Sequence, residues 1–170
     1  MPTLAEQESS ALRGFPSIPA QIPAARLMAL PQIVSKAIPA VSVLTTAASP
    51  YSLFTVTGLV LAQVYAITGA ALASTSNTGT LAVGISGNTA CYLAQSTVNG
   101  TNFPAANTVW AGDSSPTLLG EVLTAGALTG VLQGPTPIIA TIATNSLTTG
   151  SITFYCFYYP ISPDGAVTAA

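Results

Sequence analysis

Carboxylates are the only side chains in most of this chain that carry a charge at neutral pH. Past residue 36, the 170-residue sequence contains just three of them, Asp113, Glu121 and Asp164. Two carboxylates can share acid and base work, as in glycosidases, but Asp113 precedes Ser-Ser-Pro and Asp164 lies in Pro-Asp-Gly, which are turn sequences. Trp110 is the only tryptophan, so the aromatic groove of a sugar-cleaving site is not indicated. We therefore expect no catalytic residues and predict that the protein is not an enzyme.

Basic side chains are rarer still. Arg13, Arg26 and Lys36 are the only ones, and there is no histidine. This composition argues against nucleophilic triads that need an imidazole, histidine-ligated metals, phosphate loops that need a lysine and nucleic-acid binding. We expect no cofactor, no metal and no nucleic-acid partner. Charged residues are 5% of the chain, which suits a protein covered by neighbours in an assembly, because buried charges are costly.

The most hydrophobic stretch, residues 52–73, carries no charge and is long enough to cross a bilayer as a helix. Its Val, Thr, Tyr and Phe content favours strands, and no basic residue follows to orient it. We predict two consecutive buried strands and no membrane partner. A signal peptide is not expected, because prolines interrupt the N-terminal segment. Cys91 and Cys156 are expected to be buried free thiols of a protein made in a reducing cytoplasm, with one disulfide as the alternative.

Proline and glycine divide the chain near residue 50. Residues 1–50 hold seven of the 13 prolines and one of the 14 glycines, which predicts an extended N-terminal arm with short helical turns at 24–30 and 32–38. Residues 51–160 predict an all-β body, a jelly-roll-like β-sandwich, and residues 161–170 a C-terminal tail. The arm's apolar anchors are expected to dock on another chain, the alternative being that the arm wraps its own body: Phe15, Ile18, Ile22, Leu27 and Met28.

Two hairpins are predicted in the body. Residues 80–86 and 89–96 flank Gly87-Asn88, a two-residue turn sequence, in a register that pairs Val83 with Tyr92. A further hairpin is predicted between residues 137–143 and 152–159.

Several of these strands are apolar on both faces, among them 59–67 and 152–159. The outer faces of a small sandwich are exposed to solvent, so apolar residues on both sides of a strand indicate that a partner subunit covers the outer side. Tyrosine is enriched at such interfaces. We predict a subunit interface at the aromatic run, with exposed tyrosines on one face as the alternative: Phe154, Tyr155, Phe157, Tyr158 and Tyr159.

Three stretches carry a family resemblance: SLFTVTGLVLAQVYAITGAAL (52–72), GTLAVGISGNTACYLAQS (79–96) and GSITFYCFYYPISPDGAV (150–167). Across residues 51–170 the chain resembles head proteins of tailed bacteriophages, in particular the small decoration (cement) proteins. That resemblance implies a β-rich homotrimer on the outer surface of the virion capsid. It would bind the major capsid protein between capsomers and stabilise the shell against internal DNA pressure. Its implied partners are its own copies and the capsid protein, and it would be made in the host cytoplasm. The arm lies outside the resemblance, and we expect it to grip the major capsid protein or a neighbouring trimer.

Other functions remain open on the sequence alone. A tail, fibre or other minor structural virion protein would have the same composition. A membrane-associated protein is favoured only by hydropathy, and a carbohydrate-binding β-protein would need exposed aromatic rings on one flat face.

Overall fold

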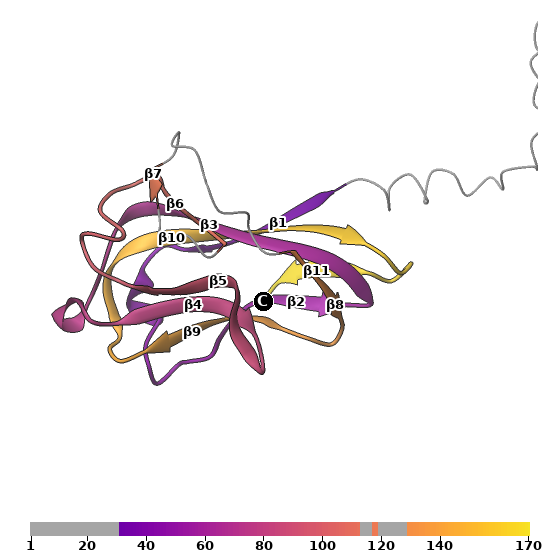
Figure 1. Cartoon of the computed structure of the whole chain (residues 1–170), viewed down its shortest axis with the longest axis horizontal. Coiled ribbons are helices and arrows are strands. Elements are labelled where there is room, and N and C mark those ends of the chain that lie inside the picture. The colour runs from indigo at the N-terminus through magenta and orange to yellow at the C-terminus, as the bar shows by residue number, and fades with distance from the viewer. Residues whose placement is uncertain (1–30, 113–116, 119–128) are drawn as a thin grey trace, which may run out of the picture. The chain divides into compact units, whose positions relative to one another are not determined.

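The body of the protein is a two-layer sandwich of antiparallel sheets (Figure 1). The structure is a computed structural model that describes residues 31–112, 117–118 and 129–170, and its compact unit spans residues 31–170. All strand pairs are antiparallel, apart from an isolated parallel bridge between Leu93 and Gly112. The prediction of an all-β sandwich is confirmed.

One layer, called sheet A, is built around its two longest strands. Its order is β1-β10-β3-β6-β7, and β8 pairs with residues 59–63 of β3, on the same edge where β6 pairs with residues 65–67. The bounds are β1 (Gln32–Ile38), β3 (Leu59–Ser74), β6 (Thr108–Ala111), β7 (Thr117–Leu118), β8 (Thr129–Gln133) and β10 (Leu147–Pro160).

The second layer, sheet B, has the order β11-β2-β9-β4-β5. Its strands are β2 (Tyr51–Thr57), β4 (Thr80–Ile85), β5 (Asn88–Thr97), β9 (Ile138–Ala143) and β11 (Ala166–Ala169). Two short 3₁₀ turns, η2 (Val41–Val43) and η3 (Thr75–Asn77), lie in the connections.

The core lies between the sheets because side chains alternate along each strand. On β3 every second residue from Val60 to Thr68 is buried, and on β10 the same holds from Ile152 to Tyr158. Sheet B contributes Phe54, Val83 and Ile138, among others. The two layers therefore share one hydrophobic core, and the remaining side chains of β3 and β10 point outward.

Residues 52–73 form β2 and β3, as predicted, with the reversal at Gly58, whose φ of +58° is readily adopted by glycine. No helix in the described ranges is long and apolar enough to span a membrane.

The predicted boundary at residue 50 is wrong. Residues 32–38, expected as a helical turn of the arm, form β1, which pairs with β10 from Gln32 opposite Tyr158 to Ile38 opposite Ile152. Alternating burial, with Ile38 inside and Ile33 outside, fits a strand and not a helix. The tail also belongs to the body, since β11 pairs with β2. The other predicted helical turn, at 24–30, lies outside the described residues.

The predicted hairpin between residues 137–143 and 152–159 does not form. β9 belongs to sheet B, where it pairs with β2 and β4, and β10 belongs to sheet A. The chain crosses from one layer to the other after residue 143, so short sequence separation did not imply strand pairing.

The hairpin of β4 and β5 is present, but its register differs from the prediction. Ile85 lies opposite Asn88, so Ser86 and Gly87 occupy the turn, and Val83 pairs with Leu93 in place of Tyr92. Register shifts separate these pairs, which marks irregular stretches typical of bulges. Gly84 permits them: an added Cβ at this residue would collide with the backbone of residues 88–90.

Candidate interaction surface

The outward side of sheet A, called the outer face, is the most distinctive surface of the molecule. Register places its residues in rows across β1, β10 and β3, such as Ser35–Tyr155–Tyr65. Its described side chains on these strands are only partly buried or exposed, and none is charged: Ile33, Ser35, Ala37, Leu59, Leu61, Gln63, Tyr65, Ile67, Ser151, Thr153, Tyr155, Phe157 and Tyr159. A sheet buried on its inner side normally presents polar residues on the outer side. This sheet presents aromatic and aliphatic residues on both.

An aromatic cluster occupies the centre of the outer face. Tyr65 of β3 stacks on Tyr155 of β10, with ring centroids 4.9 Å apart and planes 7° apart, and on Phe157 at 5.3 Å and 25°. Burial, and secondarily the charge of Tyr155, raises the pKa of Tyr65. The cluster thus offers an uncharged aromatic surface that carries two tyrosine hydroxyl groups, which suits protein contacts.

One end of the outer face is the most exposed part. Tyr159 lies opposite Leu61 on β3, and Ile33 lies on the edge strand β1 opposite Phe157. Ile33 is 59% exposed, Ile161 is 47% exposed and Tyr159 is 42% exposed. Together with Val43 these are the large exposed hydrophobic residues of the described ranges. Three of the four gather near this end.

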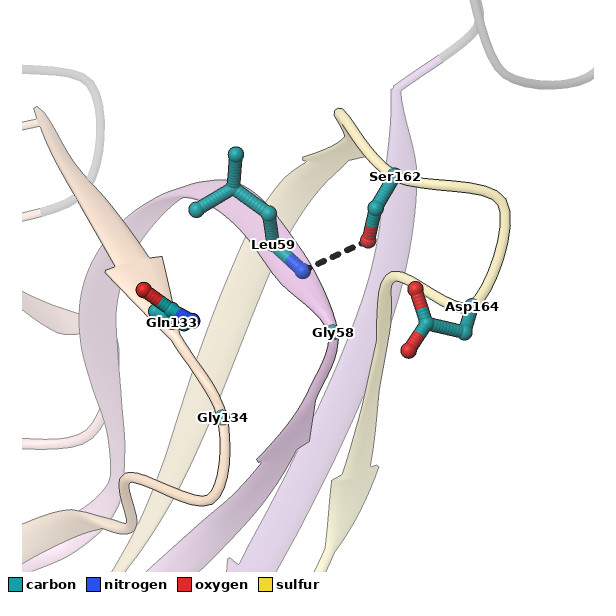
Figure 2. Close-up of a pocket in the computed structure, with 6 residues that line it drawn as sticks. All are labelled: Gly58, Leu59, Gln133, Gly134, Ser162 and Asp164. Carbon is teal, nitrogen blue, oxygen red and sulfur yellow. Dashed lines mark hydrogen bonds between the residues drawn. The ribbon is translucent and has the colours of Figure 1, made fainter.

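A polar hollow adjoins the same end (Figure 2). It has a volume of about 350 Å³ and is lined by Gly58, Leu59, Gln133, Gly134, Ser162 and Asp164. The turn of residues 162–165 is closed by the Gly165 amide, which donates to the Ser162 carbonyl at 2.9 Å, and the Leu59 amide donates to Ser162 Oγ at 2.7 Å. Because a Cβ on Gly58 would lie 2.6 Å from Asp164 Oδ1, the glycine makes room for the carboxylate.

The structure divides the five aromatic residues predicted to form a subunit interface. Tyr155, Phe157 and Tyr159 lie on the outer face, where their role as an interface stays a prediction. Phe154 is fully buried and Tyr158 is 7% exposed, so these two cannot contact a partner. They face sheet B across the core, and the Tyr158 hydroxyl donates a 2.7 Å hydrogen bond to Gln32 Oε1.

The predicted arm anchors lie outside the described residues: Phe15, Ile18, Ile22, Leu27 and Met28. Leu61 and Tyr65 join the outer face from residues 59–67, which the sequence indicated as apolar on both sides, and Ile33 joins it from residues that the sequence assigned to the arm. The apolar odd positions of residues 59–67 were the available indication, and only the pairing of β3 with β10 shows which aromatic residues they meet.

The described residues hold few groups with reactive chemistry. Asp164 is their only carboxylate side chain, and Asp113 and Glu121 lie outside them. Lys36 is their only basic side chain, and its Nζ donates to the backbone carbonyl of Ala170, linking β1 to the end of β11. In the described ranges no three His, Cys, Asp or Glu side chains are placed to hold a metal.

The two cysteines are unpaired, as predicted. Burial raises the pKa of the Cys156 thiol to about 12, and it also raises the pKa of Cys91. Both thiols are therefore protonated at neutral pH, which makes them poor nucleophiles.

No family model, no curated protein and no solved structure matches this chain.

Proposed function

We propose that this protein is a structural subunit that assembles with its own copies through the outer face of sheet A. The observation that carries the proposal is the uncharged, aromatic and aliphatic outer face of a sheet whose inner side already forms the core. In a monomer such a face leaves apolar area in water, at a cost of roughly 25 cal/mol per Å².

The size of the face fits part of an interface. Strands lie about 4.8 Å apart and side chains on one face repeat every 6.7 Å or so, so three strands and five rows cover roughly 480 Å². This area lies within the range of the largest patches on monomeric proteins. It falls below the roughly 800 Å² per partner of a standard interface. Neighbouring copies would need to cover this face and some further surface.

We propose further that the assembly is a homotrimer that decorates the outer surface of a tailed-phage capsid, bound to the major capsid protein between capsomers and stabilising the shell. This proposal draws on the resemblance of residues 51–170 to decoration proteins and on the scarcity of charge. A closed trimer covers equivalent faces about one axis. Three weak capsid contacts then gain avidity from one another.

The geometry of the aromatic cluster does not favour a carbohydrate-binding protein. Sugar rings stack on aromatic faces that are open to solvent. Here Tyr65 and Tyr155 stack on each other at an angle of 7°, and Phe157 lies against the Tyr65 ring. Those ring faces are already in contact within the chain.

The proposal is tested with the full-length protein and a phage lysate in which it is produced. Intact particles are purified by density gradient, treated with a mild chelator-free wash, and probed for the protein by mass spectrometry. Co-purification at a stoichiometric ratio to the major capsid protein, with release as a trimer, supports the proposal. A protein that stays entirely in the particle-free fractions would overturn the virion part, and a monomer at all concentrations would overturn self-assembly.

A further inference from the structure

The N-terminal segment contains a repeated pattern that suits a particular kind of docking. Phe15-Pro16, Ile18-Pro19 and Ile22-Pro23 each place a large apolar residue directly before a proline. A residue before proline favours extended backbone, and a polyproline II helix has three residues per turn and a rise of 3.1 Å. The sequence Arg13-x-x-Pro16-x-x-Pro19 therefore favours a conformation in which Arg13, Pro16 and Pro19 share one side at spacings of about 9 Å.

Such a segment is better suited to the face of a sheet than to its edge. A peptide that extends a sheet contributes backbone amide donors at alternate positions, and residues 16, 19 and 23 have none because they are prolines. Proline-rich extended peptides instead dock through side chains on surfaces lined by aromatic residues. The outer face provides such a surface, with Tyr159 and Phe157 beside aliphatic Leu61.

Charge complementarity selects the exposed end of that face. Asp164 is the only carboxylate side chain in the part of the chain that the structure describes, and it borders the hollow beside Leu59 (Figure 2). The N-terminal segment holds both arginines of the chain, and Arg13 lies three residues before Pro16. A guanidinium pairs well with a carboxylate and also stacks on tyrosine rings.

We propose that residues 13–23 of one copy dock on the exposed end of the outer face of a neighbouring copy. Arg13 enters the polar hollow and pairs with Asp164, while Phe15-Pro16 and Ile18-Pro19 cover Tyr159 and the adjoining apolar residues. This inference rests on the self-assembly proposed above and names the segment that supplies the missing contact area.

The missing contact area favours a neighbouring copy over the same chain. β1 begins at Gln32 opposite Tyr158, so the chain enters sheet A at the same end as the hollow. The outer face alone falls short of a standard interface, and in a closed ring of copies a segment from the next subunit would add contact area between subunits.

A charge-swap experiment on the full-length protein tests the Arg13–Asp164 pair. Arg13→Glu and Asp164→Arg are each expected to raise the dissociation constant of the oligomer by about tenfold, as for a close interfacial charge pair. The double variant should return to within about threefold of the natural protein. Arg26→Glu is the matched control, with the same charge change in the same segment outside the Pro16–Pro19 pattern, and a change below about threefold is expected for it. Sedimentation velocity measures association, and circular dichroism confirms folding.

A second measurement distinguishes neighbouring from intramolecular docking. Unlabelled protein carrying a photo-crosslinking benzoylphenylalanine at position 15 is mixed with ¹⁵N-labelled natural protein, and cross-linked peptides are identified by mass. Links from position 15 to labelled peptides around residues 59–65 or 155–164 support the proposal. Links confined to the same chain overturn it.

The failures of the two proposals are distinguishable. An oligomer that forms normally, responds equally to Arg13→Glu and Arg26→Glu, and shows no such links would refute segment docking while leaving self-assembly intact. A monomer under all conditions would remove both.

Discussion

Two phenylalanines on one strand provide a direct comparison between core and interface. Phe154 and Phe157 lie three residues apart on β10 and point to opposite sides of sheet A, Phe154 into the core and Phe157 onto the outer face. Truncating each to alanine removes the same atoms from two environments. If the outer face is an interaction surface, the two variants must fail in different ways.

The expected magnitudes follow from burial. Phe154 is fully buried, so Phe154→Ala leaves a cavity and should cost about 3–5 kcal/mol of the free energy of unfolding. Phe157 is partly exposed and stacks on one side against Tyr65, so Phe157→Ala should cost about 1–2 kcal/mol in the isolated fold. Its larger effect should be on association, where losing an aromatic contact at the centre of an interface weakens binding by about tenfold or more.

The assay pairs two readouts on the same samples. Urea unfolding at fixed protein concentration gives stability, and sedimentation velocity over a concentration series gives the dissociation constant. Because association itself stabilises the fold, stability is compared at concentrations where both proteins are dissociated. If Phe157→Ala were as destabilising as Phe154→Ala and left association unchanged, the outer face would be a structural surface and the reasoning would be refuted.

Three further predictions address the fold. Alkaline pH should destabilise the protein, because burial raises the pKa of Cys156 from about 9 to about 12. The stability that its neutral thiol contributes is complete below pH 9 and is lost as the pH rises toward 12, by at most about 1.4 kcal/mol per pH unit. Urea midpoints measured from pH 7 to 11 should fall less steeply in Cys156→Ala, and equal slopes in the two proteins would contradict this prediction. Gly84→Ala should lower the melting temperature strongly because its Cβ would collide with the Asn88 carbonyl oxygen, whereas Gly100→Ala, with open space around its Cβ, should leave it nearly unchanged; similar melting curves for the two would be inconsistent with the β4–β5 geometry. Thr68→Val should cost about 1–3 kcal/mol, because the buried Thr68 hydroxyl donates to the Ala105 carbonyl at 2.6 Å and accepts from the Thr108 amide at 2.9 Å; a urea-unfolding difference below 0.5 kcal/mol or so would show that these bonds contribute little.

The sequence predicted the class of fold because local patterns determine it. Alternation and β-branched content located β2 and β3 within residues 52–73, and the turn residues around Gly87 located the β4–β5 hairpin. The register of that hairpin was missed because it depends on irregular pairing at Gly84, which alternation does not encode.

Which strands pair with each other was harder to predict from the sequence than where the strands lie. β9 and β10 are neighbours in sequence yet lie in different layers, because the short connection after Ala143 crosses between the sheets. Similarly, Pro31 and Pro39 suggested that residues 32–38 belonged to the arm, whereas the prolines flank an edge strand, a position that tolerates them.

Part of the candidate surface could be predicted from the sequence. Five aromatic residues in a short run indicated a partner, but a strand directs them to both sides, and only the position of sheet B shows that Phe154 and Tyr158 are the core members. Tyr65 joins the outer cluster from 90 residues away, through the register of β3 with β10.

The native mass of the full-length protein, measured by sedimentation or native mass spectrometry across micromolar concentrations, tests the central claim most directly. The account predicts a trimer of about 51 kDa, three times the chain mass of 17.0 kDa, that dissociates when the outer face is altered at Phe157. A single species of one chain mass at every concentration, unchanged by substitutions on that face, would contradict it.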